Sequence, residues 1–407
     1  MNKINFCRNC RSKALRKLFY LGRFSFSGKF LKQGKKTPLS TLTLVICNTC
    51  KLVQLKEKFN LNYLYNHNYG YETGMNKTMT DHMKNVVQTL SKKINLNKND
   101  HVLDIASNDA TLLKNYKKSI IKWGVDPIIN KFKKNYKFID YKIAKFFSYN
   151  SIVKLNKKIK FKIITAMSVF YDLNDPNIFL QDIKKLLHKN GIFYLEFADL
   201  KLILQKKMFD TICHEHLEYY SVTFIFYLLK RHNLRIFDHH YNDINGGSSA
   251  YLICHEDAIF KTNEKKINKI LNEEKKVGID KIETYIKFKK DIDLLRKNLN
   301  YIISKIEKNK KIIHGYAAST KGNILLQYFN LNFKKIKFIS DRNPKKHGLF
   351  TPGTNIPIIS EKESRSLKPD YYLVLAWHFE KEILNREKQI RKQGTKFIFP
   401  LPKLKIL

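Results

Sequence analysis

Short apolar runs and amphipathic runs alternate through the middle of the chain, and this alternation predicts its secondary structure. Four apolar runs have the length of buried strands. They are residues 101–106 (HVLDIA), 122–126 (KWGVD), 161–167 (FKIITAM) and 191–197 (GIFYLEF). The run at residues 177–191 has helical periodicity, and Gly191 is expected to end that helix. Another helix is expected to begin at residues 111–116 (TLLKNY).

Strands that alternate with helices predict an α/β fold with a doubly wound parallel sheet. Ligands of such a sheet bind beyond the carboxyl ends of its strands. We therefore expect the site just after Ile105, Val125 and Met167. A Lys- and Glu-rich helical stretch, residues 261–310, then leads into a further predicted strand at residues 311–318.

Length and charge narrow the class of protein. The 407 residues suffice for two or three domains, each with its own core. The chain has no run of 18 apolar residues, and its first residues, MNKINFCRNC, lack the apolar core of a signal peptide, so we expect a cytoplasmic protein without a membrane partner. The net charge of +42 is spread along the whole chain. This distribution favours solvated lysines over a nucleic-acid-binding surface, and no nucleic-acid partner is expected.

The cysteines predict a metal site near the N-terminus. Cys7 and Cys10 form one CxxC pair, and Cys47 and Cys50 form another. In a cytosolic chain two such pairs indicate a zinc ion held by four thiolates rather than disulfides. Four thiolates leave no open position for a substrate, so this zinc is expected to be structural. Cys213 and Cys254 stand alone in the sequence.

Two aspartates at strand ends are candidates for contact with a nucleoside. Asp104 lies near the end of the first predicted strand, and Asp126 closes the second, where a carboxylate can accept hydrogen bonds from ribose hydroxyls. A turn aspartate before Pro127 that bonds only its own backbone is the alternative. The first turn, residues 106–110 (ASNDA), lacks the GxGxxG pattern that cradles a pyrophosphate. S-adenosylmethionine therefore fits better than a dinucleotide.

The most unusual stretch is TICHEHLEYYS, residues 211–221, which concentrates proton-handling side chains between two apolar segments. His214 and His216 are two residues apart, whereas the HExxH pattern of zinc proteases places its histidines one helical turn apart. Acid–base chemistry is one interpretation. A polar turn in which the histidines only form structural hydrogen bonds is the other, and this stretch alone does not decide between them.

Several motifs together resemble those of a known family. In chain order behind the four cysteines they are VLDIASNDATLL, GVDP, DTICHEHLEYYS, NGGSSAYL, GYAASTKGNILLQYF and DRNPKKHGLFTPGTNIPI. This combination is similar to the S-adenosylmethionine-dependent sugar C-methyltransferases, which make branched-chain deoxysugars. The resemblance covers nearly the whole chain. It implies methylation at carbon 3 of a nucleotide-linked 4-keto-6-deoxyhexose.

The resemblance also implies three domains. A zinc module is expected at residues 1–62, a class I methyltransferase domain with a Rossmann-like sheet at 63–260, and a Rossmann-like domain that helps to hold the nucleotide sugar at 261–407. The expected cofactors are S-adenosylmethionine and structural zinc, and the expected partner is the nucleotide-sugar substrate. The oligomeric state stays open.

Site residues carried over from the family fall into three groups. His216 is the favoured general base, Glu215 could orient it or bind a sugar hydroxyl, and Tyr219 or Tyr220 could hydrogen-bond the enolate oxygen. The residues expected at the cofactor are Asp104, Ala106, Ser107, Asn108, Asp109, Asp126 and Ser168. Those expected at the substrate are His214, Ser319, Lys321 and Asn323, with the turn at residues 319–322 suited to a diphosphate.

The chain also departs from the family pattern. Cys213 stands where many members have a tyrosine, and Ala106 and Ala110 replace glycines common in the first turn, where each methyl could crowd the cofactor. Ser168 and Asp172 stand where many members have an asparagine and a later histidine. Two rival functions follow, an RNA or protein methyltransferase with a zinc module and a non-catalytic relative.

Overall fold

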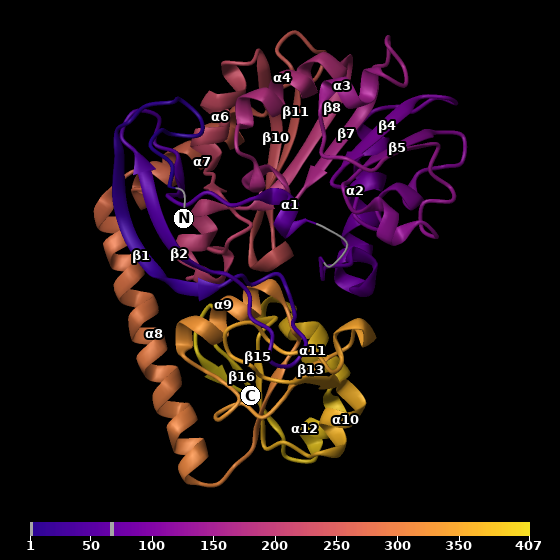
Figure 1. Ribbon diagram of the computed structural model, residues 1–407. Coiled ribbons are helices and arrows are strands. Elements are labelled where there is room, and N and C mark those ends of the chain that lie inside the picture. The colour runs from indigo at the N-terminus through magenta and orange to yellow at the C-terminus, as the bar shows by residue number, and fades with distance from the viewer. Residues whose placement is uncertain (1–2, 66–68) are drawn as a thin grey trace.

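The computed structural model describes residues 3–65 and 69–407, and three β-sheets organise this part of the chain (Figure 1). The first sheet has the strand order β1-β2-β3-β9, the second β10-β11-β8-β7-β4-β5-β6, and the third β14-β13-β12-β15-β16-β17. Figure 1 shows the second sheet at the top of the molecule, the third at the bottom, and the long strands β1 and β2 beside them. The predicted α/β fold, with a Rossmann-like central sheet and a second C-terminal sheet, is confirmed.

The central sheet contains the four predicted strands. Its strands are β4 (His101–Ile105), β5 (Ile121–Val125), β6 (Tyr141–Ile143), β7 (Phe161–Met167), β8 (Leu187–Ala198), β10 (Leu234–Asn242) and β11 (Ser248–His255). Strands β6, β5, β4, β7 and β8 run parallel to one another. Strand β11 pairs antiparallel with β8, and β10 pairs antiparallel with β11. The chain order runs in opposite directions on the two sides of β4, so the β4–β7 boundary is a topological switch point, where a crevice opens beyond the strand ends.

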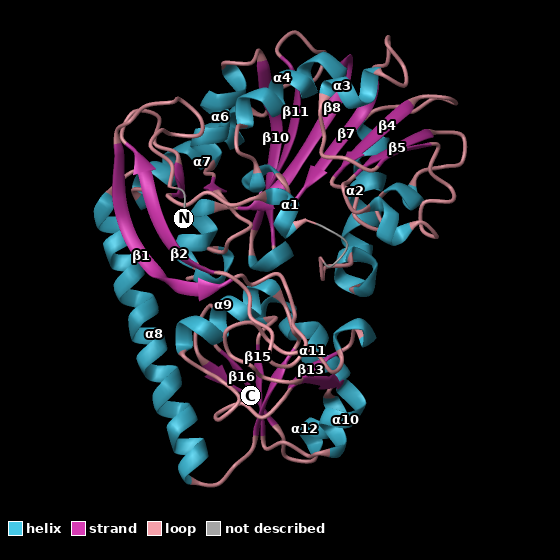
Figure 2. Ribbon diagram, in the orientation of Figure 1, coloured by secondary structure: helices cyan, strands magenta, loops and turns pink. Residues whose placement is uncertain are grey.

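The helices cover both sides of the sheets (Figure 2). Those of the first two-thirds of the chain are α1 (Leu61–Leu64), α2 (Lys77–Lys93), α3 (Tyr149–Val153), α4 (Pro176–Leu186), α5 (Leu200–Gln205), α6 (Val222–Lys230), α7 (Glu264–Val277) and α8 (Ile282–Lys308). The C-terminal domain contributes α9 (Thr320–Phe329), α10 (Glu361–Ser366), α11 (Glu380–Arg386) and α12 (Lys388–Lys392).

Three sequence-based predictions of helices were wrong in detail. The helix expected to end on Gly191 ends at Leu186, and Gly191 lies inside β8. Glycine is needed there because a side chain would meet the Phe161 carbonyl oxygen at 2.9 Å. Residues 111–116 form only a 3₁₀ turn, Leu113–Asn115. The helical stretch at 261–310 is two helices, because Gly278 adopts a left-handed conformation, with φ 69°, that ends α7.

The N-terminal sheet is completed by a strand from the middle of the chain. Its members are β1 (Leu15–Ser25), β2 (Leu39–Cys47), β3 (Val53–Leu55) and β9 (Glu218–Tyr219), and all three pairings are antiparallel. Helix α8 packs along the outside of β1, where the Phe19 and Phe288 rings lie 5.7 Å apart. The predicted division at residues 62/63 and 260/261 stays a prediction.

The C-terminal sheet is again mainly parallel. Its strands are β12 (Ile313–Tyr316), β13 (Ile339–Asp341), β14 (Ile358–Ser360), β15 (Tyr371–Val374), β16 (Lys396–Phe399) and β17 (Lys405–Ile406). Only β17 runs antiparallel to its neighbour. Helix α9 follows β12 directly and faces the central domain with its N-terminus, and the Trp377 indole after β15 donates a hydrogen bond to the Asp210 carboxylate at 2.8 Å. The carboxyl ends of β12 and β15 therefore lie against the central domain.

Candidate active site and metal centre

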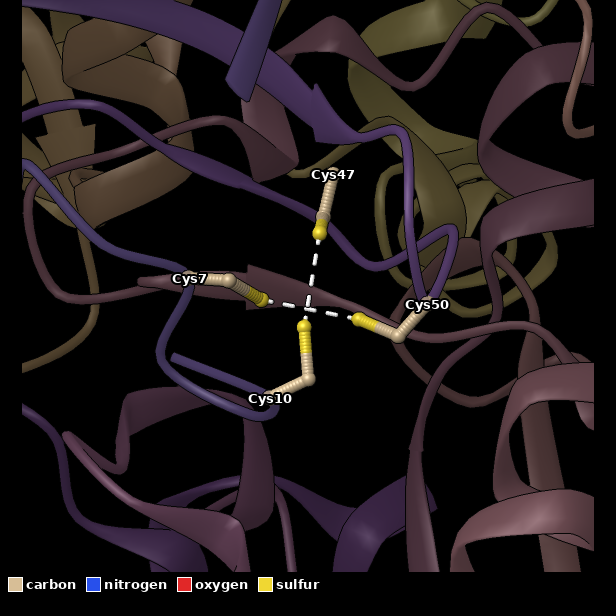
Figure 3. Close-up of side chains that lie close together, drawn as sticks. All are labelled: Cys7, Cys10, Cys47 and Cys50. Atoms are coloured by element: carbon tan, nitrogen blue, oxygen red, sulfur yellow. Dashed lines mark hydrogen bonds between the residues drawn. The ribbon is translucent and has the colours of Figure 1, made fainter. Parts of the chain in front are cut away.

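The four N-terminal cysteines meet in one cluster (Figure 3). The four sulfur atoms all lie within 4.8 Å of one another, with Cys7 and Cys50 at 3.5 Å and Cys10 and Cys47 at 3.5 Å. Each CxxC turn closes on itself, because the amide of Arg11 donates to the Cys7 carbonyl and that of Lys51 to the Cys47 carbonyl. This donor set fits a tetrahedral zinc ion and leaves no position for a substrate.

The surroundings of the cysteines also fit a metal-bound thiolate. The Gln54 side-chain amide donates to the Cys7 sulfur at 3.2 Å, as partners of metal ligands commonly do. The pKa of the Cys7 thiol is lowered to about 5, mainly by the hydrogen bond from Cys50. The same hydrogen bond raises the pKa of Cys50. Zinc binding requires deprotonated thiols, so binding of the ion to this cluster releases protons.

Arg8 ties the metal cluster to strand β3. Its guanidinium is buried and donates to the carbonyls of Leu55 at 2.5 Å and Glu57 at 2.7 Å, while its backbone amide donates to the Gln54 side chain. Strand β3 in turn pairs with β9, and the Leu55 amide donates to the Leu217 carbonyl at 2.8 Å. The cysteine cluster is therefore connected to the residue that follows His216.

A single cavity of about 420 Å³ collects residues from all three parts of the chain. The central domain contributes strand-end residues, among them Asp104, Asp126 and Ser168. The HEH segment, residues 214–216, contributes Glu215 and His216, and the C-terminal domain contributes the start of α9. The cavity thus lies at the switch point predicted for the site, beyond the ends of β4, β5 and β7.

Most of the residues predicted at the cofactor line this cavity. They are Asp104, Ala106, Ser107, Asn108, Asp126 and Ser168. The Asp126 carboxylate accepts hydrogen bonds from the amides of Asn108 and Ile128, each at 2.9 Å, which fixes its orientation. Burial raises the pKa of Asp126 and raises that of Asp104 to about 7. Each carboxylate oxygen of Asp126 keeps a lone pair for a further donor.

Asp109 and Ala110 lie outside the cavity wall. Asp109 turns away and accepts the Gly74 amide at 2.7 Å, which fastens the segment before α2 to the first turn. Ala110 is fully buried in the domain core. We expected both alanines of this turn to crowd the cofactor. Ala106 lines the cavity and is in a position to do so, whereas Ala110 is not. Both alanines keep a left-handed backbone, with φ 57° and 60°, of the kind that glycine adopts without strain.

His216 has the geometry of a neutral base. Its Nδ1 lies 2.7 Å from the Thr211 carbonyl oxygen, which can only accept, so the ring proton is on Nδ1 and Nε2 is the free acceptor. Its ring packs on that of Tyr171, with centroids 4.0 Å apart. Burial, reinforced by Lys321, lowers the pKa of His216 to about 3. The imidazole is therefore uncharged at neutral pH.

The neighbours of His216 divide into cavity and core. Glu215 lines the cavity and accepts a hydrogen bond from the Ser27 hydroxyl at 3.4 Å. His214 is fully buried between the Phe26 and Phe59 rings, so our expectation that it contacts substrate is not supported. Cys213 is also fully buried. Residues 213–215 form a bend rather than a strand, so His214 and His216 do not share one face and have different surroundings.

Tyr219 and Tyr220 do not reach the cavity either. The Tyr219 hydroxyl donates to the His216 carbonyl at 3.0 Å, and the Tyr220 hydroxyl donates to Glu218. Because both phenols belong to β9 and the turn after it, pairing with β3 directs them into the protein. We expected one of them at the enolate oxygen, but neither lines the cavity. Tyr219 instead fixes the loop that contains His216 through its hydrogen bond to the His216 carbonyl.

The C-terminal domain brings two of its three predicted residues to the cavity. Ser319 caps α9 and lines the cavity with Lys321, whose ammonium donates to the Asn245 carbonyl at 2.8 Å and lies 4.0 Å from Asp210. Asn323 points away, and its side chain donates to the Ser27 carbonyl at 2.6 Å. The expectation that Asn323 contacts the substrate is therefore not supported.

Other lining residues were not identified from the sequence. They are Tyr65, Tyr69, Tyr71 and His378, among others, while Asp172, noted above only as a departure from the family pattern, also lines the cavity. The tyrosines belong to the aromatic-rich segment before α2, whose density of phenols is the one signal that could have pointed to them. His378 follows β15 and reaches the cavity only because the C-terminal sheet directs its strand ends toward the central domain. In the described residues no helix is both long and apolar enough to cross a membrane.

The metal site gives a direct prediction. Cys47→Ser removes one of four thiolates, so zinc should fall from one ion per chain to well below one, and the N-terminal sheet should become sensitive to protease. Cys254→Ser, which changes a buried cysteine remote from the cluster, should keep one zinc per chain. Metal analysis by mass spectrometry and limited proteolysis measure both effects. Absence of zinc from the parent protein purified without chelator would contradict the assignment.

Comparison with known proteins agrees with this organisation. Three family models match in succession, a putative zinc binding domain at residues 7–65, a methyltransferase domain at 75–239 and a C-methyltransferase C-terminal domain at 243–402. The chain is 29% identical over 371 residues to the C-methyltransferase NovU of Streptomyces niveus, an alignment that covers 91% of this chain and 88% of NovU.

Solved structures with partial likeness include two methyltransferases. One is an S-adenosylmethionine-dependent methyltransferase from Clostridium acetobutylicum, 14% identical, covering 43% of this chain and 92% of that one, with a TM-score of 0.36. The other is the magnesium protoporphyrin IX methyltransferase of Synechocystis with bound S-adenosylhomocysteine, 12% identical, covering 44% and 88%, with a TM-score of 0.34.

The order of the three models, the cysteine cluster and the cavity at the switch point confirm the zinc module, the cofactor fold and the C-terminal domain expected from the sequence. The chain is an S-adenosylmethionine-dependent methyltransferase that matches, in order, the models of a putative zinc binding domain, a methyltransferase domain and a C-methyltransferase C-terminal domain.

Proposed function

We propose that this enzyme methylates carbon 3 of a nucleotide-linked 4-keto-6-deoxyhexose. The observation that carries the proposal is the uncharged His216 in the cavity that also contains the cofactor-side strand ends. A methyltransferase that acts on oxygen or nitrogen finds lone pairs on its substrate. Carbon has none until a proton leaves, so a C-methyltransferase needs a base beside the methyl donor.

The chemistry assigns a role to each side of the cavity. When bound, S-adenosylmethionine supplies an electrophilic methyl group, and the cavity-lining carboxylate of Asp126 is suited to its ribose hydroxyls. Nε2 of His216 accepts the proton from the carbon beside the ketone, and the electron pair moves onto the ketone oxygen to give an enolate. The low pKa of His216 keeps the ring unprotonated before this step across the neutral range.

The C-terminal side of the cavity supports a substrate with a diphosphate. Helix α9 begins there with Ser319 and Thr320, and the N-terminus of a helix carries partial positive charge and free amide groups. Lys321 adds a full positive charge at the same place. Its ammonium is now engaged with the Asn245 carbonyl and lies near Asp210, so a diphosphate would compete with those contacts.

The proposal is tested by incubating the enzyme with S-adenosylmethionine and a panel of nucleotide 4-keto-6-deoxysugars. We expect the mass of at least one sugar to increase by one methyl group, and proton NMR should place that group on the carbon beside the ketone. Methylation of RNA or protein without any turnover of the panel would contradict the proposal and favour the rival class of methyltransferase. Cofactor binding without turnover of any substrate class would favour a non-catalytic relative.

Loss of the Asp126 carboxylate should weaken cofactor binding. Asp126→Ala removes a charged acceptor from the cavity, so the affinity for S-adenosylhomocysteine should fall by about 1.5–3 kcal/mol, the range for a hydrogen bond to a charged group. Isothermal titration calorimetry measures the change. Asp140→Ala is a control at an aspartate between β5 and β6, and its affinity should match the parent. An unchanged affinity for Asp126→Ala would remove this residue from the cofactor site.

Removal of the proposed base should separate binding from chemistry. His216→Ala should lower kcat by about 10²–10⁴-fold, the usual contribution of a positioned general base, with little change in affinity for S-adenosylhomocysteine. His240→Ala is a control at a partly buried histidine on β10 and should retain parental kcat. Steady-state kinetics and calorimetry report the two quantities. Parental kcat in the His216 variant would show that another group removes the proton.

A further inference from the structure

Asp172 lines the active-site cavity, and one oxygen of its carboxyl group is buried without a partner in the described part of the chain. Asp172 ends the 3₁₀ turn Phe170–Asp172 that follows β7, is 6% exposed, and lines the cavity. The Tyr65 hydroxyl donates to its Oδ2 at 2.6 Å. Its Oδ1 is buried and has no hydrogen-bond partner among the described residues. A buried polar atom without a partner is destabilising, and a suitable ligand atom would recover that free energy.

The surroundings indicate where the proton of this carboxyl group lies. Burial raises the pKa of Asp172 well above its usual range, and the nearby Glu215 and Glu218 raise it further, while the Tyr65 hydroxyl opposes them. These surroundings favour the protonated, neutral form of the Asp172 carboxyl group. Because Oδ2 already accepts the Tyr65 proton, the acid proton belongs on Oδ1, where it is available as a donor.

The segments that contain Asp172 and His216 are fastened together. Tyr171, the residue before Asp172, packs its ring on the His216 imidazole with centroids 4.0 Å apart. The amide of Leu217, the residue after His216, donates to the Tyr171 carbonyl at 2.8 Å. A neutral acid and a neutral base therefore lie on two segments that are fastened together, and both residues line the same cavity.

We propose that the Oδ1–H group of Asp172 donates a hydrogen bond to the ketone oxygen of the substrate and stabilises the enolate. This inference rests on the proposed function. As Nε2 of His216 takes the proton, the C–H bond breaks and its electron pair moves onto the ketone oxygen. The proton of Asp172 stays on Asp172 while its hydrogen bond to that oxygen strengthens. After methyl transfer to carbon, the ketone re-forms and His216 returns its proton to water.

The other acids near His216 are less suited to this role. The hydroxyls of Tyr219 and Tyr220 donate within the protein, as described above. Glu215 faces the N-terminal segment, where its carboxyl accepts the Ser27 hydroxyl and lies against Gly28. A protonated aspartate, kept neutral by its apolar surroundings, is moreover a known hydrogen-bond donor to an enolate oxygen.

The test follows proton removal without methyl transfer. The enzyme is saturated with S-adenosylhomocysteine and a keto-sugar that the parent methylates, in deuterated water, and NMR measures exchange of the C–H beside the ketone. Asp172→Leu should lower the exchange rate by about 10²–10³-fold, the usual effect of removing one oxyanion donor. Asp172→Asn keeps an N–H donor beside Tyr65 and should stay within about tenfold of the parent, because a donor to the oxyanion remains.

Two controls separate this role from a structural one. Asp199→Asn changes a fully buried carboxyl group whose two oxygens accept the Leu202 amide and the Ser249 hydroxyl, and it should exchange like the parent. All variants should bind S-adenosylhomocysteine with parental affinity, which shows that the cofactor side is intact. In isotope-edited infrared spectra, the C=O stretch of the bound sugar should shift to higher frequency in Asp172→Leu but not in Asp172→Asn.

Two outcomes would overturn the inference while leaving the proposed function in place. One is parental exchange by an Asp172→Leu variant that binds the cofactor product normally. The other is an equal loss in Asp172→Leu and Asp172→Asn, because a group that acts by donating a hydrogen bond is partly replaced by an amide. Absence of exchange in the parent enzyme with every sugar of the panel would instead contradict the proposed function, and the inference with it.

Discussion

The pairing of β3 with β9 is the constraint on which the active site depends. It joins the end of the HEH segment to the module that contains the four cysteines, through the hydrogen bond from the Leu55 amide to the Leu217 carbonyl. Arg8, which lies within the first CxxC pair, fixes β3 from the other side by binding the carbonyls of Leu55 and Glu57. A zinc ion with four thiolate ligands has no catalytic position, yet its module determines where His216 lies.

The same segment is also fastened to the central domain. The Leu217 amide donates to the Tyr171 carbonyl, and the Tyr219 hydroxyl donates to the carbonyl of His216. The N-terminal sheet and the central domain thus hold the His216 segment from two sides. The turns after β4 and β7 have a left-handed backbone at Ala106, Asn108 and Ser168. Such strained conformations cost free energy and persist where the surrounding structure enforces them, as is common at functional sites. The stability of the two sheets therefore supports the geometry of the cavity.

The electrostatics of the cavity contrast with those of the whole chain. The net charge is +42, but burial keeps His216 neutral and raises the pKa values of Asp104, Asp172 and Glu215. Lys321 and Lys346 are cationic side chains that the C-terminal domain brings to this wall together with the start of α9. The cavity thus combines a buried acid–base region with positive charge, an arrangement suited to enolising a ketone attached to an anionic group.

Much of this organisation follows from local sequence patterns. The strands β4, β5, β7 and β8 were predicted because each is a short apolar run, and the metal site because paired CxxC turns have few other uses. The end of α4 was not predicted, because Gly191 is required by its close approach to the Phe161 backbone rather than by a helix terminus. That requirement comes from sheet packing, which a local pattern does not contain.

The same limit applies to the site. His216 was predicted from a motif and Asp126 from a strand end, and both line the cavity. His214, Tyr219 and Tyr220 belong to the same motif, but pairing with β3 turns the two tyrosines inward and the Phe26 and Phe59 rings enclose His214. Asp172 and Tyr65 are far apart in the sequence and meet only in the folded chain. Their contact required the structure.

The central claim is that one cavity brings a methyl donor and an acidic C–H group together at His216. A crystal structure with S-adenosylhomocysteine and an unreacted nucleotide 4-keto-sugar tests this claim most directly. The account predicts that the carbon beside the ketone lies within reach of both the cofactor sulfur and Nε2 of His216, with the diphosphate at the start of α9. A sugar bound with that carbon away from Nε2, or away from the cofactor sulfur, would contradict it.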